Sequence, residues 1–192
     1  MIAETGQINV CPIGESNVHD FRGLLARPPE GWCWCVAWEV ESWDEWGSRS
    51  SEQNRALRED LWSKGRFEGY LIYKKDEPIG WVRCGPSSLW PKLGESRGVK
   101  LSNKSWTFTC FGMRPEYRRL GYVKIASQKL IEDLAETGAR HFVAIPKKSC
   151  GFKLDDSEAW NGPEKMFIDL GFQLLNSFEC HSVYELRLPL HN

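Results

Sequence analysis

Apolar residues recur at helical spacing in four parts of the chain. Side chains three or four positions apart place one apolar face on each segment, as in Val18, Phe21 and Leu25. In the second segment Ser50 is followed three residues later by Gln53, which is the spacing of a capping box at the start of a helix. The predicted helices cover residues 16–26, 50–64, 119–136 and 160–170.

Other segments carry the aromatic and branched residues typical of strands. They cover residues 67–73, 79–84, 106–113, 141–145, 172–178 and 183–188. A turn at residues 75–78 joins the first two into an antiparallel hairpin. Residues 85–104 form a loop long enough to act as a functional cover. Residues 31–46 hold five of the ten tryptophans, and their pattern leaves open a strand, a loop or a lid over a pocket.

The chain shows no repeat, low-complexity tract or linker that would divide it. A length of 192 residues with 41% hydrophobic content suits one globular domain with a sizeable core. We therefore predict a single domain over residues 1–192.

The charge balance argues against polyanionic partners. Lys and Arg total 25 against 26 Asp and Glu, so the net charge of -1 provides no broad positive field for nucleic acid or an anionic membrane surface. No apolar run approaches the roughly 20 residues of a membrane span, and the first residues lack the features of a secretory signal. The sequence predicts a cytoplasmic protein with no membrane or nucleic-acid partner.

Seven cysteines are scattered along the chain, an odd number that favours reduced thiols over a disulfide framework. The Cys33-Trp34-Cys35 segment could begin a zinc site, but no second closely spaced Cys or His pair follows it. We therefore predict no bound metal.

One short segment favours an anion site. Arg118-Arg119-Leu120-Gly121 lies between a predicted strand and a long helix. Backbone amides at a helix N-terminus and the positive end of the helix dipole hold phosphate well. The two arginines add charged donors, and Gly121 allows close approach of the backbone.

The wider segment from Met113 to Val123 resembles the coenzyme A diphosphate loop of the GNAT superfamily. That loop reads Gln or Arg, two residues, Gly, one residue, then Gly or Ala. Arg118 and Gly121 match it, whereas Val123 replaces the small residue. Residues 138–140 and 166–172 are similar to later helix-to-strand junctions of the family, and the resemblance covers residues 67–188. Residues 33–35 resemble the N-terminal part of a bacterial GNAT subgroup with a Cys-Trp-Cys segment.

The resemblance implies an α/β fold of the α+β type, with helices on both faces of a mixed, mostly antiparallel sheet that splays open for coenzyme A. It implies an acetyl-CoA-dependent N-acetyltransferase with an amine acceptor. Residues 1–65 would form a helical, Trp-rich, acceptor-side part, and residues 66–192 the acyl-CoA-binding core. Exposed backbone groups near Phe111, Gly112 and Met113 would pair with the pantetheine arm. The implied cofactor-binding residues are Phe111, Gly112, Met113, Arg118, Arg119, Leu120, Gly121, Tyr122 and Val123.

Acyl transfer to an amine needs a base, because an alkyl ammonium with a pKa near ~10.4 is protonated at neutral pH. The location of carboxylates in the resembling architecture offers several candidates, and the sequence does not choose among them. They are Glu68, Asp155, Asp156, Glu158 and Glu164. A backbone N–H near Met113 could hold the oxyanion.

Many relatives protonate the leaving thiolate with a Tyr at the position that Phe167 occupies here. If that helix points the ring at the sulfur, Phe167→Tyr should be tolerated and should raise turnover. Ser149 and Cys150 are possible substitutes for the missing acid. An acyl-cysteine at Cys110 or Cys150 is disfavoured because no His has a recognisable spacing to either, so we expect direct attack in a ternary complex.

Two hypotheses stay open. The first is the N-acetyltransferase, acting as a monomer or a homodimer on an unidentified amine. The second is a non-catalytic acyl-CoA-binding or sensing module, which the phenylalanine at position 167 and Val123 keep in play. The tryptophans of residues 31–46 either line an acceptor pocket or pack in the core.

Overall fold

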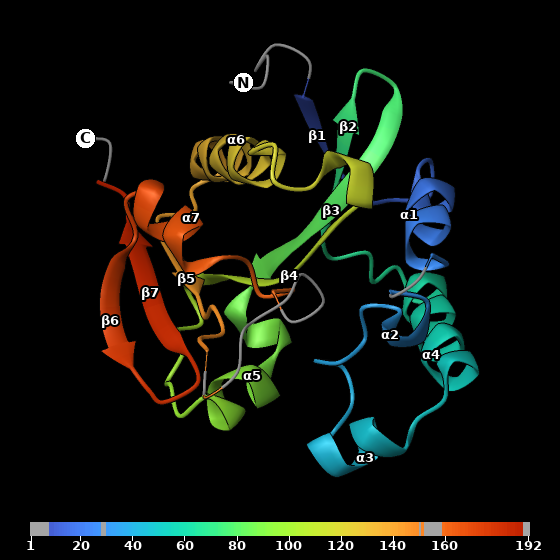
Figure 1. Cartoon of the computed structure of the whole chain (residues 1–192), viewed down its shortest axis with the longest axis horizontal. Coiled ribbons are helices and arrows are strands. Elements are labelled where there is room, and N and C mark those ends of the chain that lie inside the picture. Colours follow the sequence, from blue (N-terminus) through green and yellow to red (C-terminus); the bar gives the residue numbers. More distant parts are fainter. Residues whose placement is uncertain (1–7, 28–29, 150, 152–158, 190–192) are drawn as a thin grey trace.

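A seven-stranded sheet organises the molecule (Figure 1). The computed structural model describes residues 8–27, 30–149, 151 and 159–189. The strand order is β1-β2-β3-β4-β5-β7-β6, and every neighbouring pair is antiparallel except β4 and β5. The strands are β1 (Ile8–Pro12), β2 (Tyr70–Lys74), β3 (Glu77–Pro86), β4 (Trp106–Met113), β5 (His141–Ala144), β6 (Gln173–Ser177) and β7 (Ser182–Arg187). The predicted mixed, mostly antiparallel sheet is confirmed.

Helices surround the sheet. The α-helices are α1 (Val18–Leu25), α2 (Glu30–Cys33), α3 (Trp43–Ser48), α4 (Ser51–Ser63), α5 (Pro91–Ser96), α6 (Tyr122–Glu136) and α7 (Glu164–Asp169), with short 3-10 turns η2 (Ser87–Leu89) and η3 (Pro115–Tyr117). In the part of the chain that the structure describes, no helix is long and apolar enough to cross a membrane.

Strand periodicity divides the core into two layers. Successive side chains of a strand point to opposite faces, so neighbours in the sequence enter different cores. On β4, Phe111 belongs to one cluster and Cys110 to the other, and on β3 Val82 and Trp81 divide in the same way. The central strands are therefore buried on both faces.

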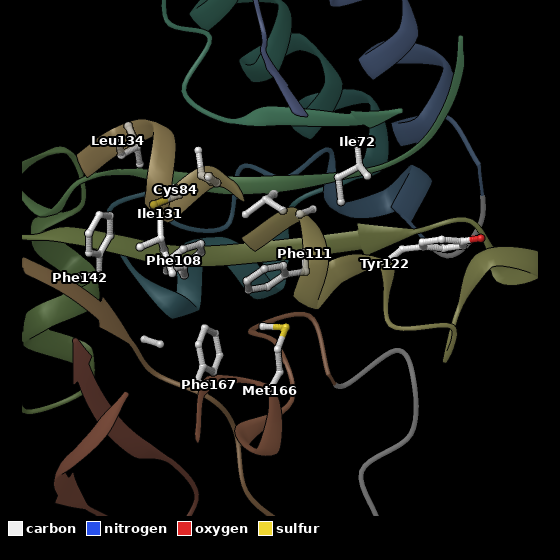
Figure 2. Packing of buried hydrophobic residues seen from close by; sticks show 14 of the residues in the cluster. Ile72, Cys84, Phe108, Phe111, Tyr122, Ile131, Leu134, Phe142, Met166 and Phe167 are labelled. Atoms are coloured by element: carbon white, nitrogen blue, oxygen red, sulfur yellow. The ribbon is translucent and has the colours of Figure 1, made fainter. Parts of the chain in front are cut away.

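Each core has its own helices. Figure 2 shows the first, in which Phe108 and Phe111 of β4 face Phe167 and Met166 of α7, and α6 contributes Ile131 and Leu134 from the other side of the cluster. The second core contains apolar residues of α1, Trp62 of α4 and Leu93 of α5, together with residues of the Trp-rich segment. Helices thus cover both faces of the sheet, as expected.

Local sequence signals mark the start of one helix accurately. Ser50 Oγ accepts from the Gln53 amide at 3.3 Å, and Gln53 Oε1 accepts from the Ser50 amide at 2.7 Å. The capping box predicted for α4 is therefore confirmed.

Three expectations need correction. Residues 85–104 are not a continuous loop, because η2 and α5 form within them. The last predicted helix begins at Glu164 and not at residue 160, since Gly162 adopts a left-handed φ of 86° and Pro163 is the N-cap. Strand β1 was not predicted, and it forms through pairing with β2.

The Trp-rich segment is neither a strand nor an open loop. It forms α2, a turn and α3, and Trp34 and Trp38 are buried in the second core. Trp34 and Cys35 both adopt left-handed φ values, 46° and 55°. Such backbone costs an L-residue about 1–2 kcal/mol, so contacts elsewhere must hold this turn.

The close approach of β3 and β4 yields a stability prediction. A Cβ at Gly112 would overlap the Trp81 ring, whereas one at Gly23 in α1 meets nothing within 4 Å. We expect Gly112→Ala to lower the free energy of unfolding by about 1–3 kcal/mol, as overpacking does. Gly23→Ala, the matched control, should raise it slightly, since Ala favours a helix interior. Denaturant unfolding measures both, and equal stability of the two variants would contradict this close packing.

Candidate active site

One cavity of about 830 Å³ joins the N-terminus of α6 to the Trp-rich segment. This volume is in the range of small-molecule sites. Parts of the chain that are distant in sequence line it together: Leu25, Trp32, Cys33, Cys35, Ala37 and Trp46 from the N-terminal part, Trp81 of β3, Cys110–Met113 of β4, residues 117–119 and 121–124 around the start of α6, and Ala159, Trp160, Pro163, Lys165, Met166 and Asp169. The cavity therefore spans both cores.

One end of the cavity lies at the N-terminus of α6, which has the features of an anion site. Helix α6 starts at Tyr122 after Gly121, whose φ of 82° is left-handed, and Arg119 has a φ of 60°. The first amides of this fifteen-residue helix have no acceptor within it, and its dipole is positive here. Arg118 donates from Nε to the Met113 carbonyl at 2.9 Å, which ties the turn to the end of β4.

Eight of the nine cofactor-binding residues predicted from the sequence line this cavity. The exception is Leu120, whose side chain is 43% exposed and is not part of the wall. Their role in cofactor binding stays a prediction. Such a role requires that they line one cavity, and eight of them do.

The sheet opens beside β4. Parallel pairing with β5 ends at Phe108 and Ala144, so the second half of β4 continues without this neighbour. The segment before α7 lies there, since the Phe111 amide donates to the Trp160 carbonyl at 2.7 Å and Asn161 Nδ2 donates to the Thr109 carbonyl at 3.1 Å.

These bonds correct one expectation. The Phe111 amide and the Met113 carbonyl are not exposed groups, because Trp160 and Arg118 already use them. Sequence reasoning missed Asn161, which is 2% exposed and whose Oδ1 has no hydrogen-bond partner among the described residues. Its position before Gly162-Pro163 was read only as the start of a helix.

The other end of the cavity is aromatic and contains thiols. Trp32 and Trp46 meet edge to face with ring centroids 4.6 Å apart, and the Trp32 side chain is 42% exposed. Cys33, Cys35 and Cys110 also line the cavity. Asp169 is the one carboxylate among the described residues of the wall, and it is paired with Lys124 and Lys165.

Buried arginines hold the strained turn at this end. Arg58 Nη2 and Arg83 Nη1 donate to the Cys35 carbonyl at 2.5 and 2.7 Å, and Arg58 Nε donates to the Trp34 carbonyl at 3.2 Å. Arg83 also pairs with Glu39 at 2.7 Å. The cost of the left-handed backbone at Trp34 and Cys35 is thus offset by charged hydrogen bonds, and Arg83 connects the turn to β3.

The carboxylates predicted as bases lie elsewhere. Glu68 pairs with Arg66 at 2.8 Å, and Glu164 accepts a hydrogen bond from Tyr184 at 2.9 Å; neither lines the cavity. Asp155, Asp156 and Glu158 fall outside the described residues.

The residues predicted as general acids are not found among the described residues of the cavity wall either. Ser149 is exposed and not part of the cavity wall, and Cys150 falls outside the described residues. Phe167 is fully buried and does not line the cavity. Its ring contacts those of Phe108, Phe111 and Phe172, so it points into the core and not toward a reacting sulfur (Figure 2).

The cysteines are not all reduced. Cys11, Cys33, Cys35, Cys84 and Cys110 are free thiols, but Cys180 is disulfide-bonded, which contradicts the expectation for that residue. Within the described parts of the chain, no group of three or more His, Cys, Asp or Glu side chains could hold a metal ion.

Solved structures define the class of fold. An acetyltransferase from Thermus thermophilus superposes with a TM-score of 0.54 at 13% identity, covering 95% of this chain and 97% of that one. The GNAT-family acetyltransferase from Bacillus anthracis gives a TM-score of 0.57 at 9% identity, covering 94% and 95%. The PaiA N-acetyltransferase from Thermoplasma acidophilum, solved with coenzyme A, gives 0.51 at 11% identity, covering 94% and 98%. This chain therefore has the fold of the GNAT acetyltransferases.

The family follows from the sequence itself. The model of the acetyltransferase (GNAT) family matches residues 32–152, which is more than half of the chain, so the protein belongs to this family. Its members use acetyl-CoA. No curated protein matches the chain significantly.

The position of Phe167 reverses the result expected from its alignment with tyrosine. A hydroxyl on this ring would enter an aromatic core without a partner, so Phe167→Tyr should lower the free energy of unfolding by about 1–3 kcal/mol. Phe178→Tyr is the control, because Phe178 is only half-buried. Thermal unfolding and the rate of thiol release from acetyl-CoA are measured together. Undiminished stability with faster release would place the ring at the reacting sulfur instead.

Proposed function

We propose that this protein is an acetyl-CoA-dependent N-acetyltransferase in which an amine attacks the thioester directly within a ternary complex. The observation that carries this proposal is the single cavity that connects the anion-binding turn at α6 to the aromatic end near Trp32. A cofactor bound by its diphosphate at the first end would extend its acyl group along β4 toward the second. Membership of the GNAT family supports the reaction class.

We propose the following division of labour. Residues 1–65 supply the acceptor side, since they contribute Trp32, Cys33, Cys35 and Trp46 to one end of the cavity. Residues 66–192 supply the acyl-CoA side, with Arg118 and the first amides of α6 on the diphosphate and a backbone N–H of β4 on the oxyanion.

The acceptor end favours an amine on an apolar or aromatic body. Tryptophan rings bury such groups well and attract a cation through their faces. No carboxylate of the described wall lies there to hold a second ammonium, because Asp169 belongs to α7 beside the start of α6. We therefore propose arylalkylamines ahead of polyamines as acceptors.

A non-catalytic acyl-CoA-binding module is the second candidate. Phenylalanine at position 167 and the bond between the Phe111 amide and the Trp160 carbonyl favour it, because each departs from what transfer in a relative would use. Cofactor binding without transfer to any amine would support this alternative.

The cytoplasm is the compartment we propose. Support comes from the free thiols of Cys11, Cys33, Cys35, Cys84 and Cys110, and the disulfide at Cys180 is an exception to this pattern. Such thiols persist where glutathione and thioredoxin keep proteins reduced.

The diphosphate site can be tested by ligand-induced stabilisation. Acetyl-CoA at 100 times its Kd should stabilise the wild type by about 2.7 kcal/mol, and Arg118→Ala or Gly121→Ala should remove most of this gain. Gly138→Ala is the matched control for Gly121→Ala, because both glycines have positive φ and open space around the added Cβ. Both variants should lose similar intrinsic stability, but only Gly121→Ala should lose the response to acetyl-CoA. An unchanged response in all three variants would refute the site.

Catalysis is tested by thiol release with a panel of amines. We expect 2-phenylethylamine and related arylalkylamines to give a higher kcat/KM than spermidine, because the acceptor end has aromatic walls and no described carboxylate. Trp32→Ala should lower kcat/KM for the arylalkylamines with little effect on acetyl-CoA affinity. Bound acetyl-CoA with no release above the hydrolysis rate for every amine would support the binding module.

A further inference from the structure

Cys35 occupies an unusual position at the acceptor end of the cavity. It lines the wall, and its backbone is held in a left-handed turn by Arg58 and Arg83, both fully buried. Cys110 of β4 lines the same cavity. Two strands and a helix thus cooperate to present one thiol at this site.

One buried guanidinium near Cys35 lacks a close counter-ion. Arg83 pairs with Glu39 at 2.7 Å and lies 3.8 Å from Glu68, and the partly exposed Arg66 pairs with the same two carboxylates, whereas Arg58 forms no ion pair with a carboxylate among the described residues. Arg58 is the least satisfied, because its Nη1 is buried with no hydrogen-bond partner among the described residues. A buried guanidinium without a counter-ion is strongly unfavourable. A thiolate at Cys35 would supply the missing charge.

The titration of the thiols agrees with this arrangement. Burial alone would raise the pKa of Cys35, but the Cys110 hydrogen bond and the charges of Arg83 and Arg58 lower this pKa to about 6. Burial and the neighbouring Cys35 raise the pKa of Cys33 to about 12, and the pKa of Cys110 is also raised, first by its hydrogen bond to Cys35. Among these three thiols, only Cys35 has its pKa shifted toward the thiolate form.

Direct attack by an amine needs a group that removes its proton, and no carboxylate among the described residues lines the acceptor end of the cavity. We propose that the Cys35 thiolate is the general base for the acceptor amine, held in its ionised form by Arg58 and Arg83 and by the thiol of Cys110. This assignment rests on the proposed N-acetyltransferase function and adds a catalytic residue to it.

The proton balance is complete without a further reactant. The acceptor ammonium transfers one proton to Cys35 Sγ, and the free amine attacks the thioester carbonyl. The C–S bond of the thioester then breaks, and the departing thiolate takes the second proton from the acylated nitrogen. Cys35 returns its proton to solvent for the next cycle. Cys35 forms no covalent bond to the acyl group.

Alkylation of the wild type tests the thiolate without any acceptor. We expect the rate of iodoacetamide modification at Cys35, followed by peptide mass spectrometry, to rise with pH around a midpoint of about 6. Acetyl-CoA should slow this modification because it fills the same cavity. A midpoint near the ~8.5 of an ordinary cysteine would overturn the proposal.

A matched pair of variants tests the base. Asn and Asp both tolerate the left-handed backbone at position 35 and have nearly the same shape, so only the charge differs. Cys35→Asn should lower kcat by about 10²–10⁴-fold with an unchanged response to acetyl-CoA, as loss of a general base does. Cys35→Asp should recover at least part of this loss. Equal kcat in the two variants would overturn the assignment, provided that thermal unfolding shows both to be folded.

The pH profile supplies a readout that a structural role would not change. In the wild type, kcat/KM should decrease as the pH drops below about 6, because Cys35 becomes protonated there. Cys35→Asn should lack this acid limb of the profile. Cys11→Ser, on β1 and outside the cavity wall, should keep it.

Three further outcomes separate this proposal from the function on which it rests. Acetylation of Cys35 by acetyl-CoA alone, seen as a mass gain of one acetyl group, would make it a nucleophile and refute the base. An active enzyme whose acid limb survives in Cys35→Asn would refute the base and leave the transferase intact. Failure of every amine in wild type would refute the transferase, and with it the base, while the alkylation midpoint would still report the thiolate.

Discussion

The parallel pairing of β4 with β5 covers three residue pairs and ends at Phe108 and Ala144. Beyond this point β4 continues to Met113 with β3 on one side and the segment before α7 on the other, and residues of this half of β4 line the cavity. The turn at Arg118–Gly121 and the thiols near Cys35 depend on this divergence, because it lets one cavity reach both faces of the sheet. A sheet that stayed closed would keep the two cores apart.

The N-terminal segment reaches this opening through buried charge. Arg83 of β3 connects the Cys35 carbonyl to Glu39, and Arg58 of α4 holds the same carbonyl from the other side. Isolated buried charges would be costly, so the arginines and carboxylates must become buried together when the protein folds. The geometry of the acceptor end is thus coupled to the sheet by directional bonds as well as by apolar packing.

Local patterns predicted the parts of the structure that local physics determines. The capping box at Ser50 and the glycine before α6 act within a few residues, so their positions could be read from the chain. The turn that we propose to bind diphosphate was recognisable for the same reason, since its donors lie in one short run.

The acceptor end could not be read in this way. Cys35, Arg58 and Arg83 are separated by more than twenty residues each and meet only after the sheet forms. The Trp-rich segment shows neither a helical nor a strand period, because a left-handed turn at Trp34 and Cys35 interrupts it. Phe167 illustrates the opposite problem, in which an alignment gave the position of a residue but not the direction of its ring.

The bond between the Phe111 amide and the Trp160 carbonyl has a consequence for the rate and strength of cofactor binding. An arm that pairs with this amide can do so only in molecules where Trp160 has moved away, so the apparent affinity is reduced by the fraction of molecules that are open. The molecule with its cofactor and the molecule without it should therefore differ most in the few residues between Trp160 and α7. Hydrogen exchange at the Phe111 amide would then report how often the bond to the Trp160 carbonyl breaks.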